Sequence, residues 1–224
     1  GSRGLGDVYK RQLYKVPCSR FAKAYIPNTS IKDNARFHRK QKIVMAVDLK
    51  NFFPSIKSGY VLNVFLRMGY NLATAVMLTR LCCLRESLPQ GAPTSAYLSN
   101  LVMLHFDEKI SSYCVSHDIR YTRYADDLTF SGSFDVAAVL HLVDQELRYL
   151  NLKRNPQKLK IMHSYDSQRT TGIVVNEKQQ LPREYRMKIR QEVHYMEKFG
   201  LDDHLAHIGE SRSNYINHLL GKIR

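Results

Sequence analysis

The chain has 224 residues, of which 44% are hydrophobic, so it can build one or two packed units. Its net charge of +14 favours a polyanionic partner, and no apolar run approaches the roughly 20 residues that a membrane span requires. The four cysteines have no metal-ligand spacing, which argues against a zinc site and fits a reducing cytoplasm.

The N-terminal part of the chain carries most of the positive charge. Residues 1–42 contain eleven Lys or Arg against two Asp, a net charge of +9. A solvated basic surface would explain this excess, but we favour a segment that contacts nucleic acid, because the acids cluster elsewhere in the chain. Residues 1–12 do not continue the pattern that follows, and we expect them to be a tag remnant or a sequence-assembly scar.

The first half of the chain is predicted to contain one strand and several helices. A continuous apolar run predicts a strand over residues 43–47 that ends at Asp48. Helical spacing predicts helices over residues 61–68 and 71–84, a loop over 88–93 and one long helix over 94–117. Gly69 closes the first of these helices, and Asn71 can cap the second.

The second half is predicted to contain a hairpin, a helix and short strands before a helical tail. The expected elements are strands over 119–123 and 128–130, a helix over 136–150, and strands over 160–163 and 172–175. From Leu181 the pattern is helical, with apolar stripes typical of a separate helical subdomain. This order predicts an α+β fold with a mostly antiparallel sheet.

The turn of the predicted hairpin is Tyr124-Ala125-Asp126-Asp127, which places two carboxylates side by side. Adjacent carboxylates repel each other and are most reasonable where a divalent cation neutralises them. Asp48, at the end of the first strand, adds a third carboxylate that the sheet could bring beside the turn. Nucleotidyl transfer requires two Mg²⁺ ions with such oxygen ligands, and the main-chain carbonyl of Leu49 could add one more.

Phe53 and the pair Gln90-Gly91 are candidate nucleotide-binding residues. Phe53 lies five residues beyond Asp48, and its ring could crowd a 2′-hydroxyl and so select deoxynucleotides. Core packing is the alternative, which we favour for Phe52. Gly91 would let the backbone approach a substrate, and Gln90 could reach an incoming nucleotide. A plain helix-entry loop is the other interpretation of this pair.

Lys158 follows the predicted helix over 136–150 together with other basic residues. It could protonate the leaving pyrophosphate as a general acid, or it could belong to a solvated basic face. His204 and His207 have the spacing of a metal-binding pair, but no Cys or acidic cluster completes a zinc site. We therefore expect these two histidines to be structural.

Together these segments resemble the motifs of a reverse transcriptase. Val47-Asp48-Leu49 through Phe53-Pro54-Ser55-Ile56 is similar to the first catalytic motif, and Leu88-Pro89-Gln90-Gly91-Ala92-Pro93-Thr94-Ser95 is similar to the second. Tyr124-Ala125-Asp126-Asp127 has the Tyr-X-Asp-Asp form of the third motif, and Lys158 falls within the fourth. The resemblance covers roughly residues 20–224.

The resemblance implies a right-hand polymerase core with three parts. These are a palm with an RNA-recognition-like antiparallel sheet (43–56 and 118–180), a fingers fragment with palm helices (13–42 and 57–117) and an incomplete helical thumb (181–224). No fingers hairpin of the kind that grips a triphosphate is recognisable before Leu13. We therefore expect active-site carboxylates without a complete nucleotide clamp.

The resemblance also implies roles for individual residues. Asp48 and Asp126 would bind both Mg²⁺ ions, which Mn²⁺ could replace. Asp127 would be a weaker metal ligand or an electrostatic helper, and Tyr124 would lie near the primer end.

Two further segments are similar to those of bacterial retron enzymes. Asn34-Ala35-Arg36-Phe37-His38 matches the Asn-Ala-X-X-His element, and Thr170-Thr171-Gly172 stands where retrons usually show Val-Thr-Gly. This implies synthesis of DNA from a DNA or RNA primer on a cognate structured non-coding RNA. It also implies a place in the bacterial cytoplasm, in phage defence beside an effector protein. Asn34 and His38 would take part in recognising the RNA.

Three other functions stay open. They are a group II intron type enzyme, a defence polymerase that works without a template, and a non-catalytic RNA-binding scaffold. Three clustered acids argue against the scaffold, because a protein that only binds RNA does not need them.

Overall fold

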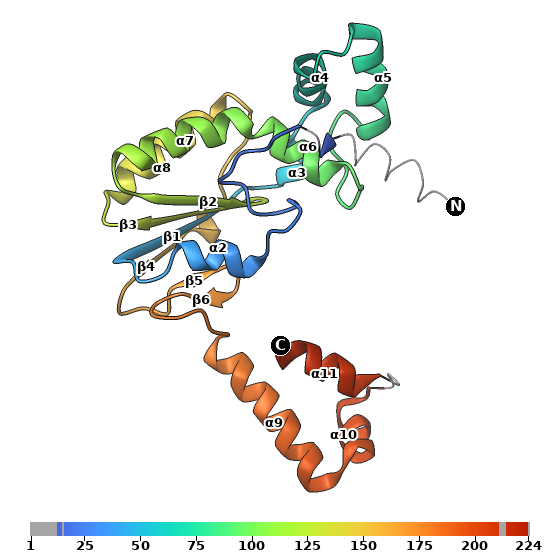
Figure 1. Cartoon of the computed structure of the whole chain (residues 1–224), viewed down its shortest axis with the longest axis vertical. Coiled ribbons are helices and arrows are strands. Elements are labelled where there is room, and N and C mark those ends of the chain that lie inside the picture. The colour runs from blue at the N-terminus through green and yellow to red at the C-terminus, as the bar shows by residue number, and fades with distance from the viewer. Residues whose placement is uncertain (1–12, 15, 211–213, 224) are drawn as a thin grey trace. The chain divides into compact units, whose positions relative to one another are not determined.

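The computed structural model describes residues 13–14, 16–210 and 214–223, and the chain divides into two compact units between residues 179 and 180 (Figure 1). The division lies next to Leu181, where we expected the helical subdomain to begin. The segment 1–12, which we expected to be a tag remnant or scar, lies outside the described residues.

Four antiparallel strands form the central sheet of the first unit, in the spatial order β2-β3-β1-β4 (Figure 1). They are β1 (Ile43–Asp48), β2 (Arg120–Tyr124), β3 (Asp127–Gly132) and β4 (Lys160–His163). Helices connect β1 to β2 and β3 to β4, whereas β2 and β3 form a hairpin. This is the split β-α-β arrangement of RNA-recognition-like sheets, so the expected α+β palm fold is confirmed.

The two faces of the sheet are covered differently. The inward side chains of β1 and β3 are Met45, Val47, Leu128 and Phe130. They share one hydrophobic core with α7 (Leu104–Ser116) and α8 (Val136–Arg148), which lie along one face of the sheet (Figure 1). Because successive side chains of a strand point to opposite faces, Asp48 and Asp127 point to the other face.

The expectation of one long helix over residues 94–117 is wrong. The structure has α6 (Ser95–Val102) and then α7, separated at Met103, which has a ψ of 0° and a completely buried side chain. All residues of α6 except Ala96 are buried, whereas α7 buries only one stripe. The interruption lets each helix face the core differently, so tertiary packing overrides a continuous helical pattern.

The remaining described elements of the first unit are short. They are α2 (Ile31–Phe37), α3 (Phe52–Ser55), α4 (Ser58–Arg67), α5 (Leu72–Cys82), a 3-10 turn at Pro156–Lys158, β5 (Arg169–Thr170) and β6 (Ile173–Val174). Asn71 caps α5 by accepting a hydrogen bond from the N–H of Thr74, as predicted. The expected strand over 172–175 is shorter than predicted, and it pairs with β5 outside the central sheet.

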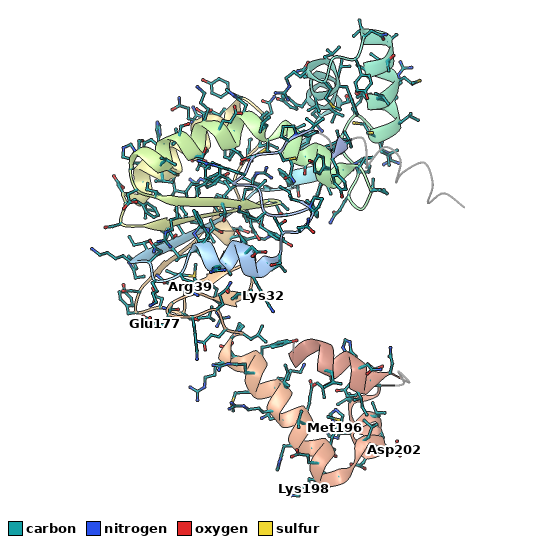
Figure 2. All side chains as sticks on the ribbon, viewed as in Figure 1. Lys32, Arg39, Glu177, Met196, Lys198 and Asp202 are labelled. Atoms are coloured by element: carbon teal, nitrogen blue, oxygen red, sulfur yellow. The ribbon has the colours of Figure 1, made fainter. Side chains whose placement is uncertain are left out.

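The described part of the second unit is helical. It contains α9 (Arg183–Phe199), α10 (Leu201–Ile208) and α11 (Tyr215–Ile223). Met196 of α9 is half-buried, whereas Lys198 and Asp202 are exposed (Figure 2). His204 is buried, with its Nε2 3.0 Å from the hydroxyl of Tyr215, so its expected structural role agrees with its position.

Phe52 is a core residue, as we favoured from the sequence. The four cysteines are free thiols, of which Cys82 and Cys114 are buried in the core. None of the described helices is long and apolar enough to cross a membrane.

Candidate active site

Three carboxylates come together where β1 meets the hairpin of β2 and β3. Asp48 is the last residue of β1 and pairs directly with Asp127, the first residue of β3; Asp126 lies in the turn just before it. The N–H of Leu49 donates to the carbonyl of Asp126 at 3.0 Å. Leu49 and Asp126 are thus a hydrogen-bonded pair, and Asp48 and Asp127 form the adjacent non-hydrogen-bonded pair, a type in which the Cα atoms are about 4.5 Å apart and both side chains lie on one face.

Two of the three carboxylates, Asp126 and Asp127, have a raised pKa, because both are partly buried and lie beside other negative charges. Burial and then the charges of Asp126 and Asp48 raise the pKa of Asp127 to about 6, against an opposing effect of Lys158 and Lys160. Burial is also the largest cause that raises the pKa of Asp126, and the charge of Asp48 adds to it. The cluster therefore carries more negative charge than its surroundings neutralise, which favours a bound cation.

Lys158 supplies part of the missing positive charge. Its ammonium group lies 3.0 Å from Oδ2 of Asp48, and this hydrogen bond and charge raise the pKa of Lys158. The side chain of Lys158 is 62% exposed, so it can turn away from Asp48 into solvent without a steric clash with the core. The structure thus brings the basic residue predicted from the fourth motif into the carboxylate cluster.

A cavity of about 700 Å³ opens beside these residues. Its lining includes Ala46, Asp48, Asp127 and Thr129 from the sheet, Lys158 and Lys160 beside them, and Thr171-Gly172 from the β5–β6 hairpin. The cavity thus brings together two of the three carboxylates, two lysine side chains and the segment where retrons usually show Val-Thr-Gly. A polyanion could lie along this lining with its phosphates beside the carboxylates.

The predicted nucleotide-binding residues lie outside the lining of this cavity. Phe53 is half-buried at the start of α3, with its ring 5.3 Å from that of Phe52. Gln90 and Gly91 are exposed in the loop before α6, and Gly91 has a φ of 87°, which favours glycine. These positions do not test the expected contacts with a nucleotide, which therefore stay predictions.

Tyr25 is a residue near the site that the sequence did not indicate. Its ring centroid lies 6.4 Å from that of Phe53, and its side chain is 44% exposed. Burial, and then the charges of Asp126 and Tyr124, raise the pKa of Tyr25. No local pattern relates residue 25 to residue 126, so only the three-dimensional structure could identify it.

Asn34 and His38, expected to recognise RNA, are completely buried. His38 lies 2.7 Å from Ser131 through Nδ1 and 2.7 Å from Thr122 through Nε2. The hydroxyl of Thr122 donates to Oδ1 of Asn34 at 2.6 Å, so it accepts from the Nε2–H of His38. The element fastens α2 to the sheet, and any part that these two side chains have in RNA recognition would be indirect.

Comparisons with known proteins identify the family of this chain. The sequence profile described as reverse transcriptase (RNA-dependent DNA polymerase) matches residues 3–196. The retron Ec86 reverse transcriptase of Escherichia coli is 34% identical over 194 residues, which are 85% of this chain and 61% of that protein. The retron Mx65 reverse transcriptase of Myxococcus xanthus is 33% identical over 232 residues, covering 92% of this chain and 54% of that protein.

A solved structure supports the fold. A telomerase from Candida albicans, solved with a fragment of telomeric RNA, aligns with a TM-score of 0.58 at 9% identity. The alignment covers 87% of this chain and 43% of the telomerase. This chain therefore spans about half the length of the proteins it matches. By its matching profile and its retron relatives, the chain belongs to the reverse transcriptase family, as a bacterial member of the retron type.

Proposed function

We propose that the chain is the catalytic part of an RNA-directed DNA polymerase that adds deoxynucleotides to a primer. The observation that carries this proposal is the convergence of Asp48, Asp126 and Asp127 on the face of an RNA-recognition-like sheet that lies opposite α7 and α8. Their half-buried position and mutual repulsion leave a local excess of negative charge that suits metal-assisted transfer of a nucleotide.

The donor set fits Mg²⁺. All three side chains offer oxygen atoms, and Mg²⁺ is usually held by one or two carboxylates while substrate phosphates and water complete its shell. Among the residues that the structure describes, no group of three His, Cys, Asp or Glu side chains, the three aspartates included, is arranged to hold a metal ion by itself, so substrate phosphates and water would have to supply further ligands. Asp48 and Asp126 would hold two ions, with Asp127 and the Leu49 carbonyl as weaker ligands. Bound Mg²⁺ would stabilise the attacking 3′-hydroxyl and the leaving pyrophosphate.

Other residues of the chain would position the substrates. Phe53 would exclude a 2′-hydroxyl, Gln90 and Gly91 would contact the incoming nucleotide, and Tyr124 would support the primer end. Tyr124 pairs with Asp127 in the hairpin, so its side chain shares the face of the carboxylates.

Lys158 would turn from Asp48 to protonate the departing pyrophosphate. A lysine amine is protonated at neutral pH, as a proton donor requires.

The template would be a cognate structured RNA, in a retron system that acts against phage together with an effector protein. Two observations support this finer proposal: the retron relatives and the basic excess in residues 1–42. RNA binding should weaken as salt concentration rises, because lysine and arginine contacts release phosphate counterions. Group II intron type synthesis, untemplated synthesis and RNA binding without catalysis are the competing outcomes.

The decisive experiment measures primer extension by Asp126→Asn with Mg²⁺, an RNA template and deoxynucleotides. We expect the rate to fall at least about 100-fold, because a metal ligand is lost while the shape of the side chain is kept. Asp118→Asn is the matched control, since Asp118 is an exposed acid just before β2, at the far end of the same strand. Undiminished extension by Asp126→Asn would refute the assignment, and sequencing the products would separate templated from untemplated synthesis.

A further inference from the structure

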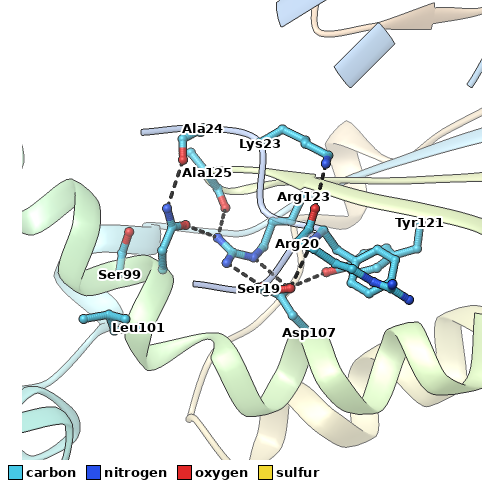
Figure 3. A network of polar contacts seen from close by, with 12 residues as sticks. Ser19, Arg20, Lys23, Ala24, Ser99, Leu101, Asp107, Tyr121, Arg123 and Ala125 are labelled. Carbon is cyan, nitrogen blue, oxygen red and sulfur yellow. Dashed lines mark hydrogen bonds and ion pairs between the residues drawn. The ribbon is translucent and has the colours of Figure 1, made fainter. Parts of the chain in front are cut away.

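Arg123 of β2 is completely buried and makes four hydrogen bonds through its guanidinium group (Figure 3). Its Nε and Nη2 donate to the two carboxylate oxygens of Asp107 at 2.9 and 2.7 Å. Its Nη1 donates to Oδ1 of Asn100 at 3.0 Å and to the carbonyl of Ala125 at 3.1 Å. Four of the five guanidinium N–H groups are therefore used, and one of them reaches the turn of the hairpin.

The bond to Ala125 acts on the peptide group that precedes Asp126. The peptide group that follows Asp126 is held from the other side, because its carbonyl accepts the N–H of Leu49 at 3.0 Å. Both peptide planes that flank the Cα atom of Asp126 are thus anchored to the palm. Since these planes set the direction of the Cα–Cβ bond, the two anchors together orient the carboxylate.

The backbone of the turn needs such support. Ala125 has a φ of 58°, in the left-handed region that residues with a Cβ atom rarely adopt. Arg123 itself is fixed by elements far from the turn, through Asp107 on α7 and Asn100 on α6. A rigid donor is therefore presented to a strained turn from the centre of the core.

We propose that Arg123 is a positioning residue, which orients the carboxylate of Asp126 by holding the carbonyl of Ala125. This inference rests on the proposed function, because it concerns the same carboxylate. If the inference is correct, loss of the bond to Ala125 changes the conformation of the turn, in addition to any loss of overall stability from a weakened ion pair.

The test replaces Arg123 by lysine and compares it with Tyr121→Phe. Arg123→Lys keeps a positive charge beside Asp107, but one ammonium nitrogen cannot occupy the positions of both Nη2, which binds Asp107, and Nη1, which binds the carbonyl of Ala125. Tyr121→Phe is the matched control, since it removes the 2.7 Å hydrogen bond from Tyr121 to Asp107 and leaves the turn untouched. Both variants weaken the same buried cluster, so general destabilisation affects both.

The first measurement is amide hydrogen exchange without metal or nucleic acid. We expect the exchange of the Leu49 amide, relative to the Phe130 amide in the middle of β3, to rise on the order of tenfold in Arg123→Lys. The ratio should stay unchanged in Tyr121→Phe. An equal ratio in the two variants would overturn the proposal.

The second measurement is the Mg²⁺ concentration that gives half-maximal primer extension. It should rise on the order of tenfold in Arg123→Lys and stay unchanged in Tyr121→Phe, because a misdirected carboxylate binds metal more weakly. An unchanged Mg²⁺ requirement in Arg123→Lys would also overturn the proposal. If the unaltered protein shows no extension, the proposed function fails, whereas the exchange ratio still decides whether Arg123 positions the turn.

A second variant covers the case in which Arg123→Lys does not fold. Asn100→Ala leaves the ion pair of Arg123 and Asp107 in place but removes the acceptor that holds Nη1 beside Ala125. We expect a smaller change of the exchange ratio in the same direction. An unchanged ratio in Asn100→Ala would then refute the proposal.

Discussion

The buried pair Arg123–Asp107 is linked through the carbonyl of Ala125 to the turn that carries Asp126, yet the pair and the cluster of Asp48, Asp126 and Asp127 differ in how their charge is balanced. The pair is fully buried at 2.7 Å, and its hydrogen-bonding groups find partners inside the protein. The carboxylate cluster is half-buried, and Lys158 supplies the only ammonium within hydrogen-bonding distance of it among the described residues. Balanced buried charge holds the hairpin in place, whereas the unbalanced charge of the three carboxylates is where we propose that a cation binds.

The largest effect is expected where the balanced pair is broken. Asp107→Ala should lower the free energy of unfolding by about 3–5 kcal/mol, because it leaves a buried guanidinium without its partner. Asp144→Ala makes the same change in the half-exposed pair with Arg154, and there the loss should stay below about 1 kcal/mol. Urea unfolding of both variants measures the difference, and equal losses would contradict the distinction drawn here.

A smaller effect is expected at a buried group that is neutral. Burial, with added repulsion from Arg120 and Lys23, lowers the pKa of His38 from 6.5 to about 3. Between these values the unfolded chain binds the proton and the folded protein does not, so stability falls as the pH falls. From pH 6.5 to pH 5 we expect a loss of about 2 kcal/mol from this residue.

Unfolding measured across this pH range in His38→Gln checks the contribution. The variant should show a shallower decline of stability with falling pH, whatever its stability at neutral pH. His141→Gln alters an exposed histidine of α8 and should keep the decline of the unaltered protein. A His38→Gln curve parallel to that of the unaltered protein would contradict the assignment.

The smallest effect is a gain of stability in the unbalanced cluster. Asp127→Asn should raise the free energy of unfolding by about 1 kcal/mol in metal-free buffer at pH 8, because it removes one of three repelling charges. Glu146→Gln neutralises an acid on α8 and should change stability by less than about 0.5 kcal/mol. Thermal unfolding distinguishes them, and a loss of stability in Asp127→Asn would mean that the cluster is balanced after all.

The sequence predicts the sheet well because its signals are local. The apolar run before Asp48 and the turn before Asp127 place β1, β2 and β3 to within about a residue at most ends. It fails at Met103, where no glycine or proline marks the break between α6 and α7. The strands are marked by nearby residues, whereas the break at Met103 is decided by packing between segments that are distant in the sequence.

The candidate site is predicted from the sequence only in part, for the same reason. The carboxylates stand next to recognisable strands, and their meeting follows from strand pairing. The burial of His38 depends on partners 84 and 93 residues away, and the anchoring role of Arg123 depends on Asp107 and Asn100. From the sequence alone, a polar residue that hydrogen-bonds inside the protein cannot be distinguished from one that binds a ligand.

The pairing of Asp48 with Asp127 also disfavours a folded state in which β1 and β3 pair in the wrong register. A slip of β1 against β3 by one residue would exchange the two faces of the strand and carry Asp48 into the apolar core. Burying an unpaired carboxylate there costs several kcal/mol, a large part of the stability of a domain. A misregistered sheet would therefore be unstable and would not accumulate beside the native one.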